Sequence, residues 1–252
     1  MSTSFHISSP SLCFLHLGEF IDELSDHFDG WQIIAEGKHS ASNIAGEFSD
    51  ISNSYELKYT VHLPFNDINV ASLNRSIRMT SINECAENIR KFSDLGVKEF
   101  VIHPGIFSVL SMYDKERAML LSREAIIALS TLARNLQSVL MVENMPSISA
   151  TACSSPSDLT KLIYGTQAEF CYDISHAALD GDYASFLRFR NTIKMIGISD
   201  NDGKTDSHLQ IGRGVLPVRE MVKMALQLEV PIVIEAKNIK EAIEGKEYLS
   251  KL

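Results

Sequence analysis

The sequence has few of the features that mark disulfide-rich, membrane-spanning or polyanion-binding proteins. Four of its 252 residues are cysteines, and no two form a C-x-x-C pair, which disfavours a zinc ribbon and a dense disulfide framework. No apolar run reaches the ~18 residues of a membrane-spanning helix, and the N-terminus lacks the pattern of a signal peptide. The net charge of −9 predicts no general attraction to nucleic acid or anionic membranes. These absences predict a cytoplasmic protein.

What is present is an alternation of short β-type runs with helical patterns, in a chain that is 45% hydrophobic and 22% charged. Such alternation favours a parallel sheet, and eight units in 252 residues predict a single (β/α)8 TIM barrel that spans residues 1–252. An open, doubly wound sheet is the alternative. The predicted strands are 5–9, 31–36, 57–65, 99–105, 138–146, 169–176, 193–200 and 230–236.

Two motifs predict where helices begin. Ser81 and Glu84 have the spacing of a capping box, which places a helix start at Ser81. Ser155 and Pro156 predict a second start, because proline suits the first helical position.

Residues that can bind metal stand at or near the ends of the predicted strands. Active sites of TIM barrels form at the carboxyl ends of the strands, so these side chains should converge on one cavity. Several carboxylates in one cavity would repel each other, and bound cations would offset that charge. Histidines with carboxylates suit Zn²⁺ or Mn²⁺ better than Ca²⁺ or Mg²⁺, so one to three such divalent ions are predicted. The candidate metal ligands are His62, His103, Glu143, Asp173, His176, Asp206, His208 and Glu235.

The stretch GISDNDGKTDSHLQIGRG, residues 197–214, has the aspartates and glycines of an ion-binding loop. An EF-hand that begins at Asp200 would need oxygen ligands where the chain has Lys204 and Ile211. The stretch also lacks the Gly-Lys-Ser/Thr pattern, at the required distance from a glycine, of a phosphate-binding loop. The stretch is therefore predicted to be strand seven and its loop, in which Asp200 and Asp202 support Asp206 and His208 rather than bind metal.

Several short motifs, taken in order, resemble the xylose-isomerase-like TIM-barrel superfamily, which includes endonuclease IV (AP endonuclease family 2) and sugar phosphate isomerases and epimerases. They are VHLPF (61–65), VIHPG (101–105), VENMPS (142–147), CYDISHA (171–177), DSH (206–208) and IEAK (234–237). The resemblance to endonuclease IV implies hydrolysis of a phosphodiester or phosphate-containing substrate by a metal-bound hydroxide. It implies catalytic roles for Glu143 as a bridging ligand and for Glu235, which would orient the water.

The same resemblance implies how the ligands would divide among three ions. His62, His103 and Glu143 would hold one. Glu143, Asp173 and Glu235 would hold a second. His176, Asp206 and His208 would hold a third. Gly197 stands where this family usually has a further histidine, so the second ion would lack one ligand.

Two other functions remain open. Sugar isomerases and epimerases of the superfamily use a single ion, for which Glu143, Asp173 and Glu235 remain. The absent histidine at Gly197 also suits a metal-binding barrel without catalysis. Abasic DNA is one candidate substrate, since Phe65 matches an aromatic position of the endonucleases; a phosphorylated or sugar small molecule is the other. Basic residues that could contact DNA are scattered: Lys38, Arg75, Arg78 and Arg213.

Overall fold

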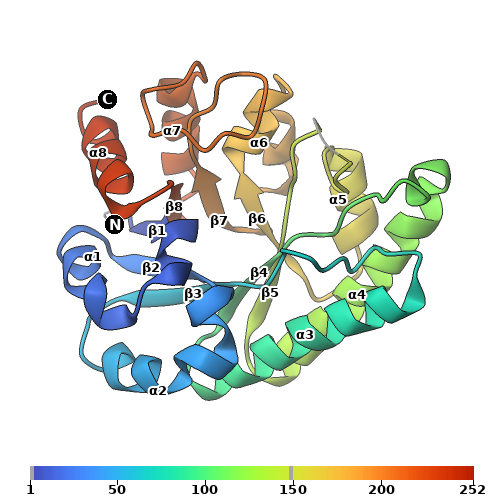
Figure 1. Cartoon of the computed structure of the whole chain (residues 1–252). Coiled ribbons are helices and arrows are strands. Elements are labelled where there is room, and N and C mark those ends of the chain that lie inside the picture. Colours follow the sequence, from blue (N-terminus) through green and yellow to red (C-terminus); the bar gives the residue numbers. More distant parts are fainter. Residues whose placement is uncertain (1–2, 148–149) are drawn as a thin grey trace.

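The computed structural model describes residues 3–147 and 150–252, and in these ranges eight parallel strands close into a barrel (Figure 1). The strands pair in chain order, and β1 closes the barrel against β8. The predicted (β/α)8 barrel is therefore confirmed. The strands are β1 Phe5–Ser8, β2 Gly30–Ile34, β3 Lys58–His62, β4 Glu99–Ile102, β5 Val139–Glu143, β6 Glu169–Asp173, β7 Ile193–Ile198 and β8 Ile232–Glu235.

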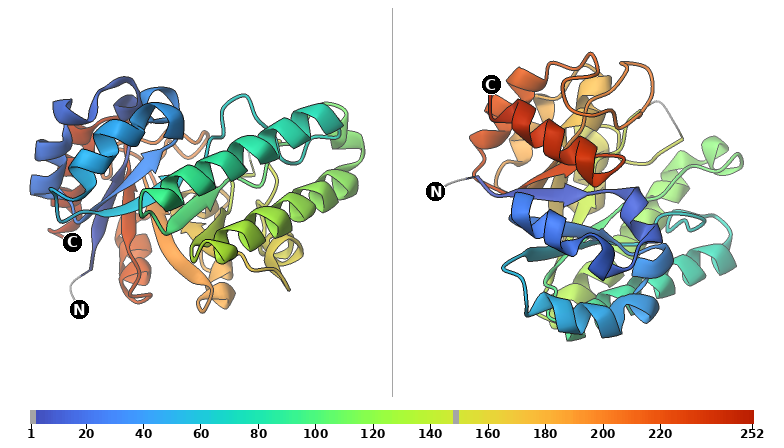
Figure 2. Two further views of the ribbon diagram at one scale, coloured as in Figure 1. Left: turned by 90° about the horizontal axis from the view of Figure 1, so that it is seen from below. Right: turned by 60° about the vertical axis from the view of Figure 1, so that its left-hand side comes forward.

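Helices follow the strands and surround the barrel (Figure 2). The α-helices are α1 Ile21–His27, α2 Ala41–Ser52, α3 Arg75–Asp94, α4 Lys115–Asn135, α5 Pro156–Ile163, α6 Ile174–Leu179, α7 Val218–Leu226 and α8 Ile239–Leu249. Short 3-10 helices include η1 Pro10–Phe14, η4 Ser111–Tyr113 and η5 Ser185–Phe189. The long helices α3 and α4 lie side by side and extend beyond the barrel (Figure 2). In the described part of the chain, no helix is both long and apolar enough to cross a membrane.

One of the two predicted helix starts is correct. Ser155 caps α5, and its hydroxyl accepts a hydrogen bond from the Asp158 amide. The prediction at Ser81 is wrong, because α3 begins at Arg75 behind the cap residue Asn74. Ser81 lies inside α3, where its hydroxyl donates to the Ile77 carbonyl. The first turns of α3 are mostly polar, so their sequence carries no apolar period that would reveal them.

The barrel interior has a layer of apolar side chains below its carboxyl end. Successive side chains of a strand point to opposite faces, so the residue two positions later also faces the interior. Two positions after this layer come His103, Glu143, Asp173, Gly197 and Glu235. The layer is formed by Val101, Met141, Cys171, Met195 and Val233. A strand-by-strand alternation thus places four predicted metal ligands and Gly197 in the next layer, at the end where a TIM barrel has its active site.

Candidate metal centre

The first cluster of the centre is carried by three neighbouring strands and consists of His62, His103 and Glu143. The Nε2 atom of His62 lies 3.1 Å from Nε2 of His103 and 3.3 Å from Oε2 of Glu143. His103 Nε2 lies 3.6 Å from the same Glu143 oxygen. Donor atoms that surround Zn²⁺ tetrahedrally at about 2.0–2.1 Å are about 3.3 Å apart. The three atoms are therefore spaced as ligands of one ion. We call this set the strand cluster.

A backbone contact orients His62 within the strand cluster. Its Nδ1 lies 2.9 Å from the Leu63 carbonyl oxygen, which can only accept a hydrogen bond. Nδ1 must therefore carry the proton, and Nε2 presents its lone pair to the cluster. Such a contact on the far nitrogen is what fixes the tautomer of metal-binding histidines. Phe65 packs beside both histidine rings, with centroid distances of 4.9 Å to each.

The second cluster consists of His176, Asp206 and His208. One oxygen of Asp206, Oδ2, lies 3.0 Å from Nε2 of His176 and 3.1 Å from Nε2 of His208. His176 Nδ1 lies 2.8 Å from the Asn144 carbonyl oxygen, so it donates there and leaves Nε2 for the cluster. Two of the three residues belong to the loop after β7, and we call this set the loop cluster.

Asp200 holds the loop that carries Asp206 and His208. Its buried carboxylate accepts hydrogen bonds from the amides of Gly212, Gly214 and Leu216, which draw the far end of the loop back to the end of β7. A β-carbon at Gly214 would collide with this carboxylate, so the close approach requires glycine. The predicted supporting role of Asp200 agrees with this geometry, whereas Asp202 is exposed and only caps the turn at Lys204 and Thr205.

Between the two clusters lie Asp173, Glu235 and the bare backbone of Gly197. A β-carbon at Gly197 would come 2.6 Å from Oε1 of Glu235 and 2.9 Å from Oδ2 of Asp173. The two carboxylates therefore occupy the space that a side chain at position 197 would need. Asp173 Oδ2 is fully buried and has no hydrogen-bond partner among the described residues. A buried carboxylate oxygen without a donor is the situation that a cation relieves.

Glu143 joins the two clusters. While Oε2 faces His62 and His103, Oε1 lies 3.5 Å from Nδ1 of His176. His176 could complete a third group with Glu143 and Asp173, but its Nδ1 donates to Asn144. We therefore assign His176 to the loop cluster by geometry.

The protonation of the centre shows how strongly its carboxylates repel. Burial, together with the charges of Asp173 and Glu143, raises the pKa of Glu235 well above its usual range. Burial also raises the pKa of Asp173 to about 6, helped by Glu143 and Asp206. Burial opposes protonation of His208, yet Asp206 and Glu235 raise its pKa to about 9. Protons on these groups offset the negative charge of the carboxylates, and divalent ions would offset it in the same way.

The donor set fits divalent metal. Imidazole nitrogens and carboxylates suit Zn²⁺ and Mn²⁺, and the two clusters have ligand spacing while the middle has an unpartnered oxygen. His62, His103 and Glu143 would hold one ion, and His176, Asp206 and His208 another. Glu143, Asp173 and Glu235 would contribute to a third position, which Gly197 leaves open on one side.

All eight residues predicted from the sequence surround one cavity or lie directly beneath it. The cavity measures about 270 Å³, and seven of the eight line it; Asp173 is buried next to them. Its remaining wall is largely apolar: Pro10, Ile34, Phe65, Met145 and Ala236. The scattered basic residues considered for DNA, namely Lys38, Arg75, Arg78 and Arg213, are not among the described residues that line it.

The sequence analysis missed two residues of the centre. Asn144 is buried, and its side-chain amide pairs with both the amide and the carbonyl of Asp173, which locks β5 to β6 beneath the site. Its own carbonyl also orients His176. Lys237 lies at the cavity mouth, two residues after Glu235. Both residues lie in the motifs VENMPS and IEAK, within two positions of a strand-end glutamate, but only the glutamates of these motifs were predicted to belong to the site.

Comparisons with known proteins agree with this fold. The chain is 28% identical to uncharacterized protein MJ1311 of Methanocaldococcus jannaschii over 256 aligned residues, covering 95% of this chain and 86% of the relative. The structure of the present chain matches that of a D-tagatose 3-epimerase-like protein. The TM-score is 0.89 and the identity 26%, and the match covers 99% of this chain and 96% of the other.

Endonuclease IV from Thermus thermophilus has the same fold, with a TM-score of 0.74 and 16% identity over 98% of each chain. Residues 21–252 also match the family model described as xylose isomerase-like TIM barrel. The chain therefore belongs to the xylose isomerase-like TIM-barrel family.

Proposed function

We propose that this protein is a divalent-metal-dependent hydrolase that cleaves the phosphoester of a small, phosphate-containing substrate. The observation that carries this proposal is the pair of three-residue clusters on either side of Glu143, each with donor atoms spaced as around an ion. An enzyme that uses a single ion has no need of both clusters. Two or more ions close together are the arrangement that hydrolyses phosphoesters.

The size and charge of the cavity favour a small molecule over DNA. A cavity of about 270 Å³ lies just below the ~300–1,000 Å³ typical of small-molecule sites. The net charge is −9, and the scattered basic residues Lys38, Arg75, Arg78 and Arg213 do not line the cavity, so the described residues offer no continuous track for a phosphate backbone. Lys237 at the mouth supplies a positive charge that can pair with one phosphate group.

The residues of the centre have different roles, which follow from where each one lies. Bound divalent ions would lower the pKa of a water molecule and offset the charge of the phosphoryl oxygens. Glu143 holds both clusters at a fixed separation through its two oxygens. Glu235 faces the cavity next to His208, with its Oε2 atom 3.5 Å from Nδ1, where it can orient the attacking water and accept its proton. Phe65 and Met145 keep bulk water from the apolar side.

Sugar isomerisation or epimerisation is the second candidate. Two observations favour it: the structural match to a D-tagatose 3-epimerase-like protein, and a cavity of the size of a sugar. In that reaction one ion would lie between Glu143, Asp173 and Glu235, and the two glutamates would exchange the proton of the sugar carbon.

Elemental analysis of protein purified without added metal separates these functions. The hydrolase should contain two or three ions per chain, and His103→Ala and His208→Ala should each lose one. His16→Ala is the matched control, because His16 is exposed and pairs with Glu47 away from the centre. A single ion that survives both variants would contradict the hydrolase and favour the isomerase. Full metal content without turnover of phosphoesters or sugars would favour a non-catalytic barrel.

A further inference from the structure

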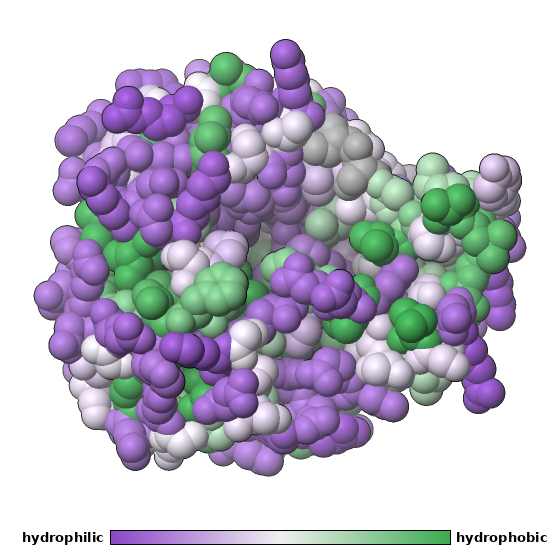
Figure 3. All heavy atoms as spheres, in the orientation of Figure 1, coloured by the Kyte–Doolittle hydropathy of each residue, from purple (hydrophilic) through white to green (hydrophobic). Residues whose placement is uncertain are grey.

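A segment that projects from the barrel carries an unusual amount of exposed apolar surface. This segment, residues 106–120, runs from the loop after β4 through η4 into α4, and we call it the arm. Figure 3 shows hydrophobic atoms gathered on the right of the molecule, where the arm extends beside a hollow. The exposed apolar side chains of the arm are Ile106, Val109, Leu110, Met112, Tyr113 and Leu120, with exposed fractions from 46% to 87%.

The arm is firmly attached to the barrel. The Asn69 side chain accepts from the Ile106 amide and donates to its carbonyl, at 3.1 and 2.8 Å. Ser122, on the next turns of α4, donates to the Pro104 carbonyl, and Asp114 caps the helix. The apolar surface is therefore preformed, and its exposure does not come from a loosely held loop.

The area of this surface is at the upper end of what a monomer usually exposes. A fully exposed aromatic side chain presents about 150–250 Å² and an aliphatic one less, so the six side chains expose roughly 500–600 Å². The largest apolar patch on a typical monomer covers ~300–600 Å². A standard interface buries about 800 Å² on each partner. The exposed side chains of the arm thus supply most of the area that one side of a stable dimer needs, and the wall of the neighbouring cavity adds to it.

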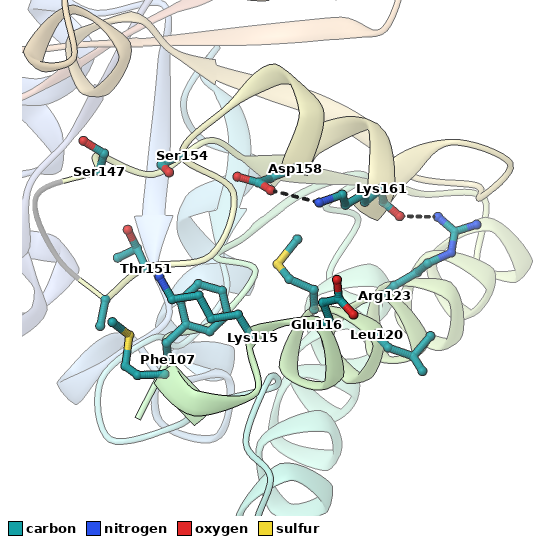
Figure 4. Close-up of a pocket in the computed structure, with 13 residues that line it drawn as sticks. Phe107, Lys115, Glu116, Leu120, Arg123, Ser147, Thr151, Ser154, Asp158 and Lys161 are labelled. Atoms are coloured by element: carbon teal, nitrogen blue, oxygen red, sulfur yellow. Dashed lines mark hydrogen bonds and ion pairs between the residues drawn. The ribbon is translucent and has the colours of Figure 1, made fainter. Parts of the chain in front are cut away.

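The neighbouring cavity makes the surface self-complementary. A cavity of about 920 Å³ lies between the arm and α5, with Phe107, Met119 and Leu120 on its arm side (Figure 4). Its charged residues are of both signs, with Lys115, Lys161 and Arg123 facing Glu116 and Asp158, so the lining carries only a small net positive charge. A two-fold interface must pair a surface with itself, which suits a projecting apolar tip next to an apolar hollow. Elsewhere the net charge of −9 would make two copies repel.

We propose that the protein forms a two-fold dimer through the arm. The tip residues Val109, Leu110 and Tyr113 of one copy enter the cavity beside the arm of the other, and the reverse contact follows from the symmetry. This proposal is independent of the reaction that the metal centre catalyses.

Sedimentation velocity over a range of concentrations tests the dimer. The wild type should sediment with twice the 28.0 kDa mass of the chain. The double variant Leu110→Asp, Tyr113→Asp should raise the dimer dissociation constant at least about 30-fold, because two charges would be buried at the interface centre. Leu226→Asp on α7 is the control: an exposed leucine away from the arm, whose replacement should leave the dimer intact.

A second experiment gives a positive readout if the charged variant misfolds. All four native cysteines are buried, so Val109→Cys introduces an exposed thiol at the tip. Mild oxidation of a mixture of Val109→Cys and Lys161→Cys, a residue of the cavity wall, should give a mixed covalent dimer, whereas a mixture of Val109→Cys and Leu226→Cys should give none. A wild type that stays monomeric up to about 100 µM, or that binds vesicles or another protein through the arm instead, would overturn the proposal.

Discussion

The strand cluster and the loop cluster use similar donors but differ in what carries them. His62, His103 and Glu143 stand at the ends of three adjacent strands of a closed barrel. Asp206 and His208 belong to a loop that contributes no strand, and Asp200 ties that loop to the barrel. The first cluster is therefore as rigid as the barrel, whereas Asp206 and His208 of the second depend on loop contacts, chiefly those of Asp200 and of Asn201, whose side-chain oxygen accepts from the Ser207 amide.

The two clusters also differ in charge. Burial lowers the pKa of His103, although Glu143 partly opposes this, so the imidazole is neutral and ready to bind metal. Asp173, Asp206 and Glu143 outweigh the burial of His176 and raise its pKa well above the usual value. The loop cluster must therefore release protons before it binds an ion. Rigidity and protonation both predict that the strand cluster binds metal more tightly.

The largest effect should come from the residue that both clusters share. Glu143→Gln removes the charge that faces His62 and His103 on one side and His176 on the other. We expect it to lose more than one ion and to lower activity at least about 100-fold, since even a supporting residue contributes 10–100-fold to metal affinity. Glu99→Gln is the control, because Glu99 is at the opposite end of the barrel, near Thr60. Unchanged metal content in Glu143→Gln would refute the whole centre.

Asp200→Asn should weaken metal binding in the loop cluster and leave the strand cluster unchanged. It weakens hydrogen bonds from three loop amides, so the unfolding free energy should fall by about 1–3 kcal/mol. Metal affinity should fall by about 10–100-fold in the loop cluster alone. Zinc titration with denaturant unfolding measures both effects, and Asp202→Asn, which alters an exposed turn, is the control. Equal loss of metal from the strand cluster would show that the loop does not act separately.

The smallest effect should be the different response of the clusters to pH. Because the pKa of His208 is raised to about 9, a proton competes with metal below that pH and no longer competes above it. Zinc affinity of the loop cluster, measured in His103→Ala, should rise up to about tenfold per pH unit between pH 7 and 9. The strand cluster, measured in His208→Ala, should change little over that range. Parallel pH curves would contradict the assigned difference.

Local sequence pattern was sufficient for the strand-borne part of the centre. The β5 run VLMVE and the β6 run EFCYD each place a polar residue two positions after an interior apolar residue, and the barrel brings such residues together. Asp206 and His208 follow no strand alternation, and only motif resemblance pointed to their roles. The start of α3 was missed because Asn74 caps a polar helical stretch that lacks an apolar period.

The sequence by itself determined the barrel and the layer of its candidate ligands, because side-chain alternation along a strand is a local property of the backbone. Only the tertiary structure decided the rest. The fold of the loop depends on Asp200 reaching amides 12 to 16 residues away. The importance of Gly197 depends on Asp173 and Glu235, which approach it from neighbouring strands. The exposure of the arm likewise depends on how far α3 and α4 extend past the barrel (Figure 2), because exposure is set by what surrounds a residue and not by its identity.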